Sequence, residues 1–113
     1  MIDLRFIKHV YVYPGKTDFR LGINRLRQCV GPNAKPQSLY VFCNANITQI
    51  KILEVEENAI WLYQKKLLKK KFMYPQKGNT TSISTQDLKA IIDGINLINK
   101  IEGVNSIKNV DLY

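Results

Sequence analysis

A run of lysines in the second half of the chain is the segment whose chemistry is easiest to interpret. Five lysines lie within seven residues: Lys65, Lys66, Lys69, Lys70 and Lys71. No acidic residue lies between Glu57 and Asp87. Lysines that neutralise phosphates release counterions from nucleic acid, and this gives affinity that does not depend on base sequence. We therefore expect the run to contact nucleic acid, and the alternative is a solvated loop between strands.

Aromatic residues flank the lysine run on both sides. They are Trp61, Tyr63, Phe72 and Tyr74. Exposed aromatic rings beside cationic side chains can stack on unpaired bases. Aromatic side chains in a sheet also serve as large parts of a hydrophobic core. The sequence leaves base stacking and core packing open as two interpretations.

A second basic group lies nearer the N-terminus. Lys16, Arg20 and Arg27 share one side of a predicted helix, whereas Arg25 lies off that side. Arginine can bind a phosphate through two parallel hydrogen bonds or read the edge of a guanine. We add the first three residues to the candidate nucleic-acid-binding set. The alternative is that Arg20 pairs with Asp18 or with a carboxylate of the sheet and only shapes the surface.

Residues suited to catalysis or to metal binding are few. His9 is the only histidine, and no neighbouring residue type marks it as part of a catalytic pair. Glu54, Glu56 and Glu57 lie close together but have no histidine or aspartate nearby in the sequence. No glycine-rich phosphate-binding motif is present. We expect no enzymatic activity, no metal site and no cofactor.

The overall charge supports an anionic partner. The 113 residues include 17 Lys and Arg against 9 Asp and Glu, which gives a formal net charge of +8. Residues 1–83 carry 14 basic and 5 acidic side chains, whereas residues 84–113 carry 3 and 4. Such a charge favours nucleic acid first, and an acidic protein or membrane surface next. Residues 1–83 should therefore hold the anion-binding surface.

Cysteine content and hydropathy indicate the compartment. Cys29 and Cys43 lie among apolar neighbours, so we expect two reduced thiols in the core. No apolar run approaches the roughly 20 residues that span a bilayer. The N-terminal stretch also lacks the apolar centre of a signal peptide. We expect a cytoplasmic protein with no membrane partner.

Hydrophobic periodicity predicts the elements that position these residues in the first half of the chain. Residues 10–13 are β-branched and aromatic and end at Pro14-Gly15, which predicts a short strand. A helix should follow over 17–30, capped by Thr17 and stopped by Gly31. Residues 39–43 form a continuous apolar run, which is typical of a central strand buried on both faces.

The second half predicts a hairpin and then a helix. Residues 49–56 alternate between apolar and polar and turn back at Glu57-Asn58 into a partner strand over 60–65. Residues 72–74 form a candidate further strand. Ser84 can cap a final helix whose apolar face comprises Leu88, Ile91, Ile92 and Ile95.

The predicted fold is therefore a single α+β domain over residues 1–103. An antiparallel meander of four to five strands, from residue 39 to residue 74, should pack with two amphipathic helices. The strand over 10–13 should lie beside 39–43, and the helix between them permits parallel pairing. The tail 104–113 is expected to be a short strand or a disordered segment. Leu97, Ile98, Ile101 and the tail are candidates for self-association or for contact with a protein partner.

Six blocks of the sequence also carry a family resemblance. They are YVYPGKTDFRLGI at 11–23, LYVFCN at 39–44, IKIL at 50–53, IWLYQKKL at 60–67, FMYP at 72–75, and ISTQDLKAIIDGI at 83–95. In this order the blocks resemble the TnpB accessory proteins of IS66-type insertion sequences, which are products of the second open reading frame. The resemblance spans about three quarters of the chain.

The resemblance implies a role in transposition beside a separately encoded transposase, with no transposase active site in this chain. Together with the charge, it leads us to expect a non-catalytic accessory protein that binds DNA, namely the element ends, through a basic surface. The alternative is a protein-interaction module that recruits or regulates the transposase. A second copy of the chain is a further expected partner class.

Overall fold

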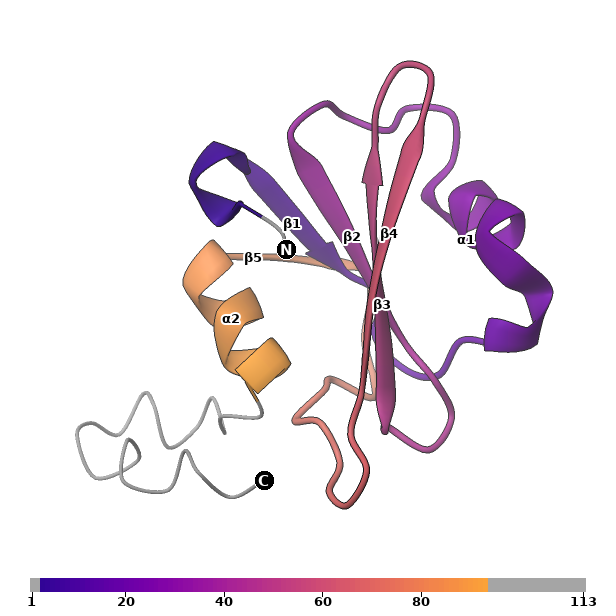
Figure 1. The fold of residues 1–113 in the computed structure, drawn as a ribbon, viewed down its shortest axis with the longest axis vertical. Helices are drawn as coiled ribbons and strands as arrows, with labels where there is room; N and C mark the ends of the chain where they lie inside the picture. The colour runs from indigo at the N-terminus through magenta and orange to yellow at the C-terminus, as the bar shows by residue number, and fades with distance from the viewer. Residues whose placement is uncertain (1–2, 94–113) are drawn as a thin grey trace.

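The computed structural model describes residues 3–93, which form one five-stranded sheet with helices on both of its faces (Figure 1). The strands are β1 (His9–Val12), β2 (Ser38–Cys43), β3 (Gln49–Val55), β4 (Ile60–Lys66) and β5 (Thr81–Ile83). The helices are α1 (Gly22–Val30) and α2 (Thr85–Asp93), with short 3-10 turns η1 (Leu4–Phe6) and η2 (Phe19–Leu21). These elements confirm the predicted α+β class.

The sheet has the order β4-β3-β2-β1-β5 and is mixed. β2, β3 and β4 form the predicted antiparallel meander, and β1 pairs with β2 in parallel. The parallel pair follows from the connection through α1. A helix crossover returns the chain to the end of the sheet at which β1 begins, so β2 runs in the same direction as β1. The sheet as a whole is therefore not purely antiparallel, and the parallel pair is the one that the predicted helix between the two strands permitted.

The strand predicted over residues 72–74 is wrong. These residues form a loop, and the fifth strand is β5, which pairs antiparallel with β1 at the other edge of the sheet. Phe72 and Tyr74 are instead buried in the core. The Tyr74 hydroxyl lies 2.8 Å from the carbonyl oxygens of both Tyr13 and Val41. The side chains of Phe72 and Tyr74 therefore fix a loop against the α2 face of the sheet, and this segment does not add a strand to the sheet.

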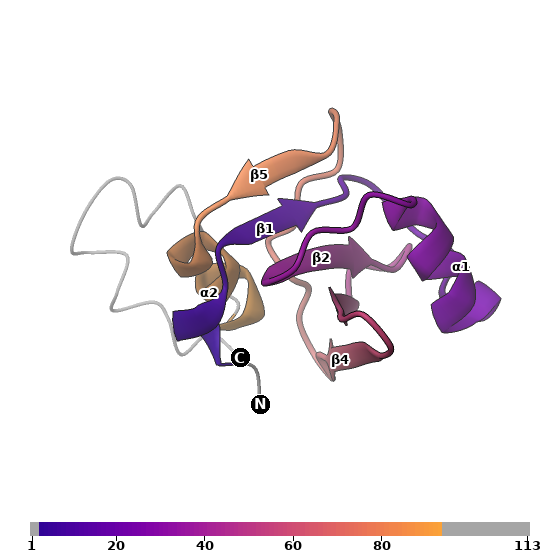
Figure 2. The ribbon, with the colours of Figure 1, turned by 90° about the horizontal axis from the view of Figure 1, so that it is seen from above.

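The two faces of the sheet are covered by different helices (Figures 1 and 2). On the α1 face, Leu26 packs with Tyr40, Phe42 and Leu53. On the α2 face, the core comprises Val10, Val12, Leu39, Val41, Cys43, Ile50, Ile52, Leu67, Phe72, Tyr74, Leu88 and Ile91. All six residues of β2 are buried, which confirms the prediction of a central strand.

The helix predicted over residues 17–30 begins later than expected. Asp18 caps η2, and α1 starts only at Gly22, whose φ of +79° favours glycine. The predicted cap of the last helix is confirmed, because the Ser84 hydroxyl accepts from the Asp87 N–H at 3.0 Å. The predictions for Ile95 and for everything after it lie outside the described residues. None of the helices described here is long and apolar enough to cross a membrane.

The cysteine prediction holds for one residue only. Both thiols are free, Cys43 is fully buried in β2, and Cys29 is exposed on α1. The correction for Cys29 arises because α1 packs on the sheet through Leu26, with Ile23 and Val30 partly buried beside it, and Cys29 lies on the other side of Leu26 from these two residues. Burial also raises the pKa of the Cys43 thiol to about 11.

We therefore expect one fast-reacting thiol per native chain. Ellman's reagent should modify Cys29 rapidly, because this thiol is exposed. Cys43 should react only after denaturation, because the thiolate is the reactive form and burial disfavours it. The variant Cys29→Ser should lose the fast phase entirely. Two thiols that react at equal rates in the native protein would contradict the burial of Cys43.

Candidate nucleic-acid interface

The turns of the sheet give its two ends opposite charge. The β3–β4 turn carries Glu56 and Glu57 at one end of the long hairpin. The β2–β3 turn (44–48) and the loop that follows β4 lie together at the other end (Figure 1). The lysine run belongs to this second end, which the acidic turn does not approach.

The lysine loop, residues 67–72, is fixed at both of its ends. The Leu67 N–H donates to the Thr48 carbonyl oxygen at 2.7 Å, and the Phe72 N–H donates to that of Ile47 at 2.8 Å. The side chains of Leu67 and Phe72 are buried, whereas the four residues between them are exposed. Lys69, Lys70 and Lys71 therefore project from a well-anchored base.

The segment before η2 crosses the same end of the sheet. The Gly15 N–H donates to the Pro75 carbonyl oxygen at 2.9 Å, and the Thr17 N–H donates to that of Cys43 at 2.8 Å. Lys16 lies between these two anchors and is exposed. The lysine loop and the first basic segment, separated by about fifty residues of sequence, are thus brought to one end of the fold.

Lys51 is a site residue that our sequence analysis missed. It lies on the α1 face of β3, and its ammonium is 4.7 Å from the centre of the Phe19 ring. Lys51 and Arg20 line one open hollow together with the amide side chains of Asn44, Asn46, Gln49 and Gln64. The sequence did contain a signal for Lys51. In the alternating strand it points to the same face as Leu53 and Val55.

We call this surface the basic end. It comprises Lys16, Arg20, Lys51, Lys66, Lys69, Lys70 and Lys71. Clustered cations of this kind raise the local concentration of polyanions and speed their association. The exposed lysines can meet successive phosphates, and the amide side chains of the hollow can add hydrogen bonds to the backbone of a nucleic acid.

Arg20 already holds a carboxylate. Its Nε and Nη2 donate to the two Asp18 carboxylate oxygens at 3.0 and 2.9 Å, and its backbone N–H donates at 3.0 Å. The predicted alternative of an Asp18–Arg20 pair is thus present. The hydrogen bonds from the Arg20 side chain, and then the one from its backbone, lower the pKa of Asp18 from 3.8 to about 2. The pair is exposed, so an incoming phosphate can also reach the guanidinium.

Because the pKa of Asp18 is lowered in the folded state, the pair stabilises the fold above pH 3.8 and loses this effect as the pH falls through about 2. In the variant Arg20→Ala we expect the pKa of Asp18 to rise towards 3.8, as measured by carboxyl NMR titration. Arg25→Ala is the matched control, because Arg25 faces Gln28 and should leave the Asp18 pKa unchanged. An unchanged Asp18 pKa in Arg20→Ala would disprove the pair.

Comparison with protein families matches residues 8–102 to the family described as IS66 Orf2 like protein. The matched range contains all five strands, both helices and every residue of the basic end. The chain belongs to the IS66 Orf2-like family. Comparisons with curated proteins and with solved structures gave no match.

Family membership confirms the resemblance drawn from the six sequence blocks. Membership of the IS66 Orf2-like family makes this an insertion-sequence-associated protein. The basic end is therefore a feature of an insertion-sequence protein.

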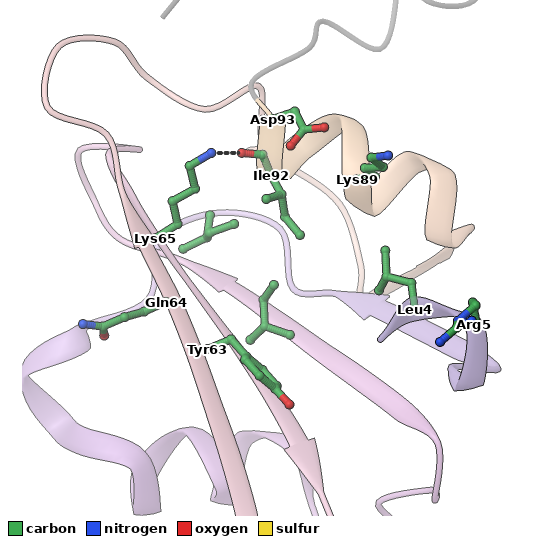
Figure 3. A pocket seen from close by; sticks show the side chains of 10 residues that line it. Leu4, Arg5, Tyr63, Gln64, Lys65, Lys89, Ile92 and Asp93 are labelled. Carbon is green, nitrogen blue, oxygen red and sulfur yellow. Dashed lines mark hydrogen bonds between the residues drawn. The ribbon is translucent and has the colours of Figure 1, made fainter. Parts of the chain in front are cut away.

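Arg27 and Lys65 were predicted to belong to the site but lie elsewhere in this IS66 Orf2-like protein. Arg27 donates to the Gly31 carbonyl oxygen at the C-terminus of α1. The expected common side of Lys16, Arg20 and Arg27 is absent because the backbone at Gly22 interrupts the helix. Lys65 points to the α2 face, and its ammonium donates to the Ile92 carbonyl oxygen at 2.8 Å (Figure 3).

An apolar groove lies beside Lys65 on the α2 face (Figure 3). It has a volume of about 570 Å³, and its apolar lining residues are Leu4, Ile50, Ile52, Tyr63 and Ile92. Charged side chains, among them Arg5, Lys89 and Asp93, stand around it. The basic end lies outside this groove, so the two features are separate parts of the IS66 Orf2-like fold.

The four aromatic residues near the lysine run divide into two pairs. Phe72 and Tyr74 belong to the core, as the packing interpretation predicted. The indole N–H of Trp61 donates to Glu56 at 3.0 Å, and the Tyr63 hydroxyl donates to Glu54 at 3.1 Å. The second pair is thus bonded to acidic residues on and beside the β3–β4 turn.

His9 and the glutamates have ordinary environments. His9 is exposed at the start of β1 and stacks on Tyr11 with 6.1 Å between ring centres. Glu54 and Glu56 accept the hydrogen bonds just described. Within residues 3–93, no three His, Cys, Asp or Glu side chains form a group able to hold a metal ion.

Proposed function

We propose that this IS66 Orf2-like protein is a non-catalytic accessory factor of transposition that binds DNA through its basic end. Its proposed target is the DNA at the ends of the insertion sequence, in the cytoplasm of the host cell. The basic end contributes phosphate contacts, which position a protein on a duplex and supply most of its non-specific affinity. Recognition of the element ends would then depend on the amide side chains of the hollow or on the transposase.

The observation that carries this proposal is the separation of charge along the sheet. Seven cations share the end formed by the β2–β3 turn and the lysine loop, with Asp18 as the acidic residue among them. Glu54, Glu56 and Glu57 lie on or beside the turn at the far end of the hairpin. Such a dipolar arrangement orients a polyanion towards one end of the molecule.

The non-catalytic part of the proposal rests on the environments of the titratable groups. The only histidine is an exposed residue at a strand start, and two of the three clustered glutamates accept hydrogen bonds from aromatic side chains. A general base needs a partner that orients it and a substrate within hydrogen-bond reach. Among the described groups, His9 stacks on Tyr11, and Glu54 and Glu56 are directed at Tyr63 and Trp61 of the same sheet, so their contacts are structural ones.

A second candidate function uses the same surface. The basic end would meet an acidic region of the transposase, and the protein would recruit or regulate that enzyme. The Asp18–Arg20 pair favours this alternative, because it demonstrates carboxylate binding at the basic end. Carboxylate and phosphate are both suited to the planar guanidinium, so charge alone does not separate the two functions.

A titration with element-end DNA, with and without the transposase, separates them. If DNA is the ligand, the chain alone should bind the duplex, and the logarithm of affinity should fall linearly with the logarithm of salt concentration. If the transposase is the ligand, the chain alone should leave the DNA unbound and should join it only when the transposase is present. The absence of binding to both would exclude both functions.

A further inference from the structure

Leu68 is an apolar residue in an unusual position. It is the first of the four exposed residues in the lysine loop, and 88% of its surface is accessible to solvent. Among the large apolar residues described, it is the most exposed. Three lysines follow it directly. A leucine with this much exposed surface, beside the lysines of a cationic surface, is available to an external partner.

The anchoring of the lysine loop holds Leu68 in a defined position. The two backbone hydrogen bonds at Leu67 and Phe72, with the burial of both side chains, limit how far the loop can move. Leu68 therefore stands at a fixed place beside cations that can hold phosphates. A wedge residue requires this arrangement, because its insertion must be held against the cost of unstacking bases.

We propose that Leu68 enters the minor groove of bound DNA and wedges open a base step, which kinks the duplex. This inference rests on the proposed DNA-binding function and assigns a distinct role to one residue of the same surface. Leucine is among the apolar side chains that proteins use as wedges, and the resulting kinks are roughly 20–90°. Flexible pyrimidine–purine steps should be preferred, because they unstack at the lowest cost.

An anionic membrane could in principle meet the same loop. A single exposed leucine gives only weak, reversible insertion into lipid, whereas one side chain suffices to wedge a base step. The cations of the basic end also extend beyond the loop to Lys16, Arg20 and Lys51, which matches an extended polyanion. Duplex DNA is therefore the partner that the loop and its surroundings favour.

The test measures bending and binding in one titration. A short duplex with a central TpA step carries a fluorescence donor and acceptor at its two ends, and the full chain is added at several salt concentrations. The wild-type protein should bind in a salt-dependent way and should increase energy transfer, because a kink brings the ends closer. Leu68→Ala should bind with the same salt slope, roughly tenfold more weakly, and without the increase in energy transfer.

Two further variants control this result. Leu68→Met should retain the bend, because methionine can also serve as a wedge. Phe6→Ala removes an exposed apolar residue (64% accessible) outside the basic end and should behave like the wild type. Both substituted positions are exposed, so each of the three variants should keep the native circular dichroism spectrum.

Several results would overturn the wedge. If the wild-type protein binds with a salt slope but leaves energy transfer unchanged, or if Leu68→Ala bends DNA as the wild type does, the wedge is wrong while DNA binding stands. If the wild type shows no salt-dependent binding, both proposals fail. Sedimentation with phosphatidylserine vesicles completes the test, because vesicle binding that requires Leu68, together with a straight duplex, would assign the loop to a membrane.

Discussion

Replacing Lys66, Lys69 and Lys70 together with glutamine should nearly abolish DNA binding at physiological salt. If each lysine neutralises one phosphate, the slope of log affinity against log salt should become shallower by about 2.7, and affinity at 0.15 M salt should fall by about 100-fold. The loss should be the same for every DNA sequence, because phosphate contacts carry no base information. Fluorescence anisotropy over a series of salt concentrations measures both quantities.

A control of equal charge makes this prediction specific to the basic end. The variant with Lys8, Lys35 and Lys89 replaced by glutamine also loses three positive charges, but these residues lie outside the basic end. Lys8 precedes β1, Lys35 precedes β2, and Lys89 lies on α2. This variant should keep the wild-type slope and most of the affinity. Equal losses in the two variants would mean that net charge, and not the lysine loop, drives binding.

Truncation of the loop anchor should have the largest effect on stability. Phe72 is 3% accessible and packs in the core of the α2 face. Phe72→Ala should lower the free energy of unfolding by about 3–5 kcal/mol, because it removes a buried ring and leaves a cavity. Urea denaturation should show this as a lower transition midpoint with an unchanged slope.

The neighbouring residue provides the matched control. Met73 is 42% accessible, and Met73→Ala should change the free energy of unfolding by no more than about 0.5 kcal/mol, as expected at a surface position. If the two variants are equally stable, Phe72 does not anchor the loop. The lysines would then not project from a fixed base.

Much of the sheet was predictable because burial leaves a periodic pattern in the sequence. The apolar run of β2 indicated a strand covered on both faces, and the alternation in β3 placed Ile50 and Ile52 on the face opposite Leu53. The strand error at residues 72–74 has a local cause. Aromatic residues favour strands, and an extended loop whose rings plug a core has the same short pattern.

The start of α1 could not be predicted from the spacing of apolar residues, for a different reason. Phe19 and Ile23 have the spacing of one helical face, and this spacing persists although the backbone at Gly22 interrupts the helix. A glycine within an apolar helical period does not reveal a positive φ. As a result, Arg27 is separated from Lys16 and Arg20, although all three were assigned to one helical side.

The basic end could be predicted only in part, because it is assembled from distant segments. The lysine run was visible in the sequence, but strand alternation sends Lys65 and Lys66 to opposite faces. Lys51 reaches the site only through the pairing of β3 with β2 and β4. Such contacts depend on which strands are neighbours in the sheet. The positions of charged residues along the sequence do not determine this.

The most direct test of the central claim is to map bound DNA on the protein by NMR. An isotope-labelled full chain is titrated with an element-end duplex, and the backbone amide shifts are followed. We predict that the perturbed amides cluster in the lysine loop, in the β2–β3 turn and at Lys16 and Arg20, while Glu56 and Glu57 stay unaffected. Perturbations centred on the β3–β4 turn or on the apolar groove beside α2, with none in the lysine loop, would contradict it.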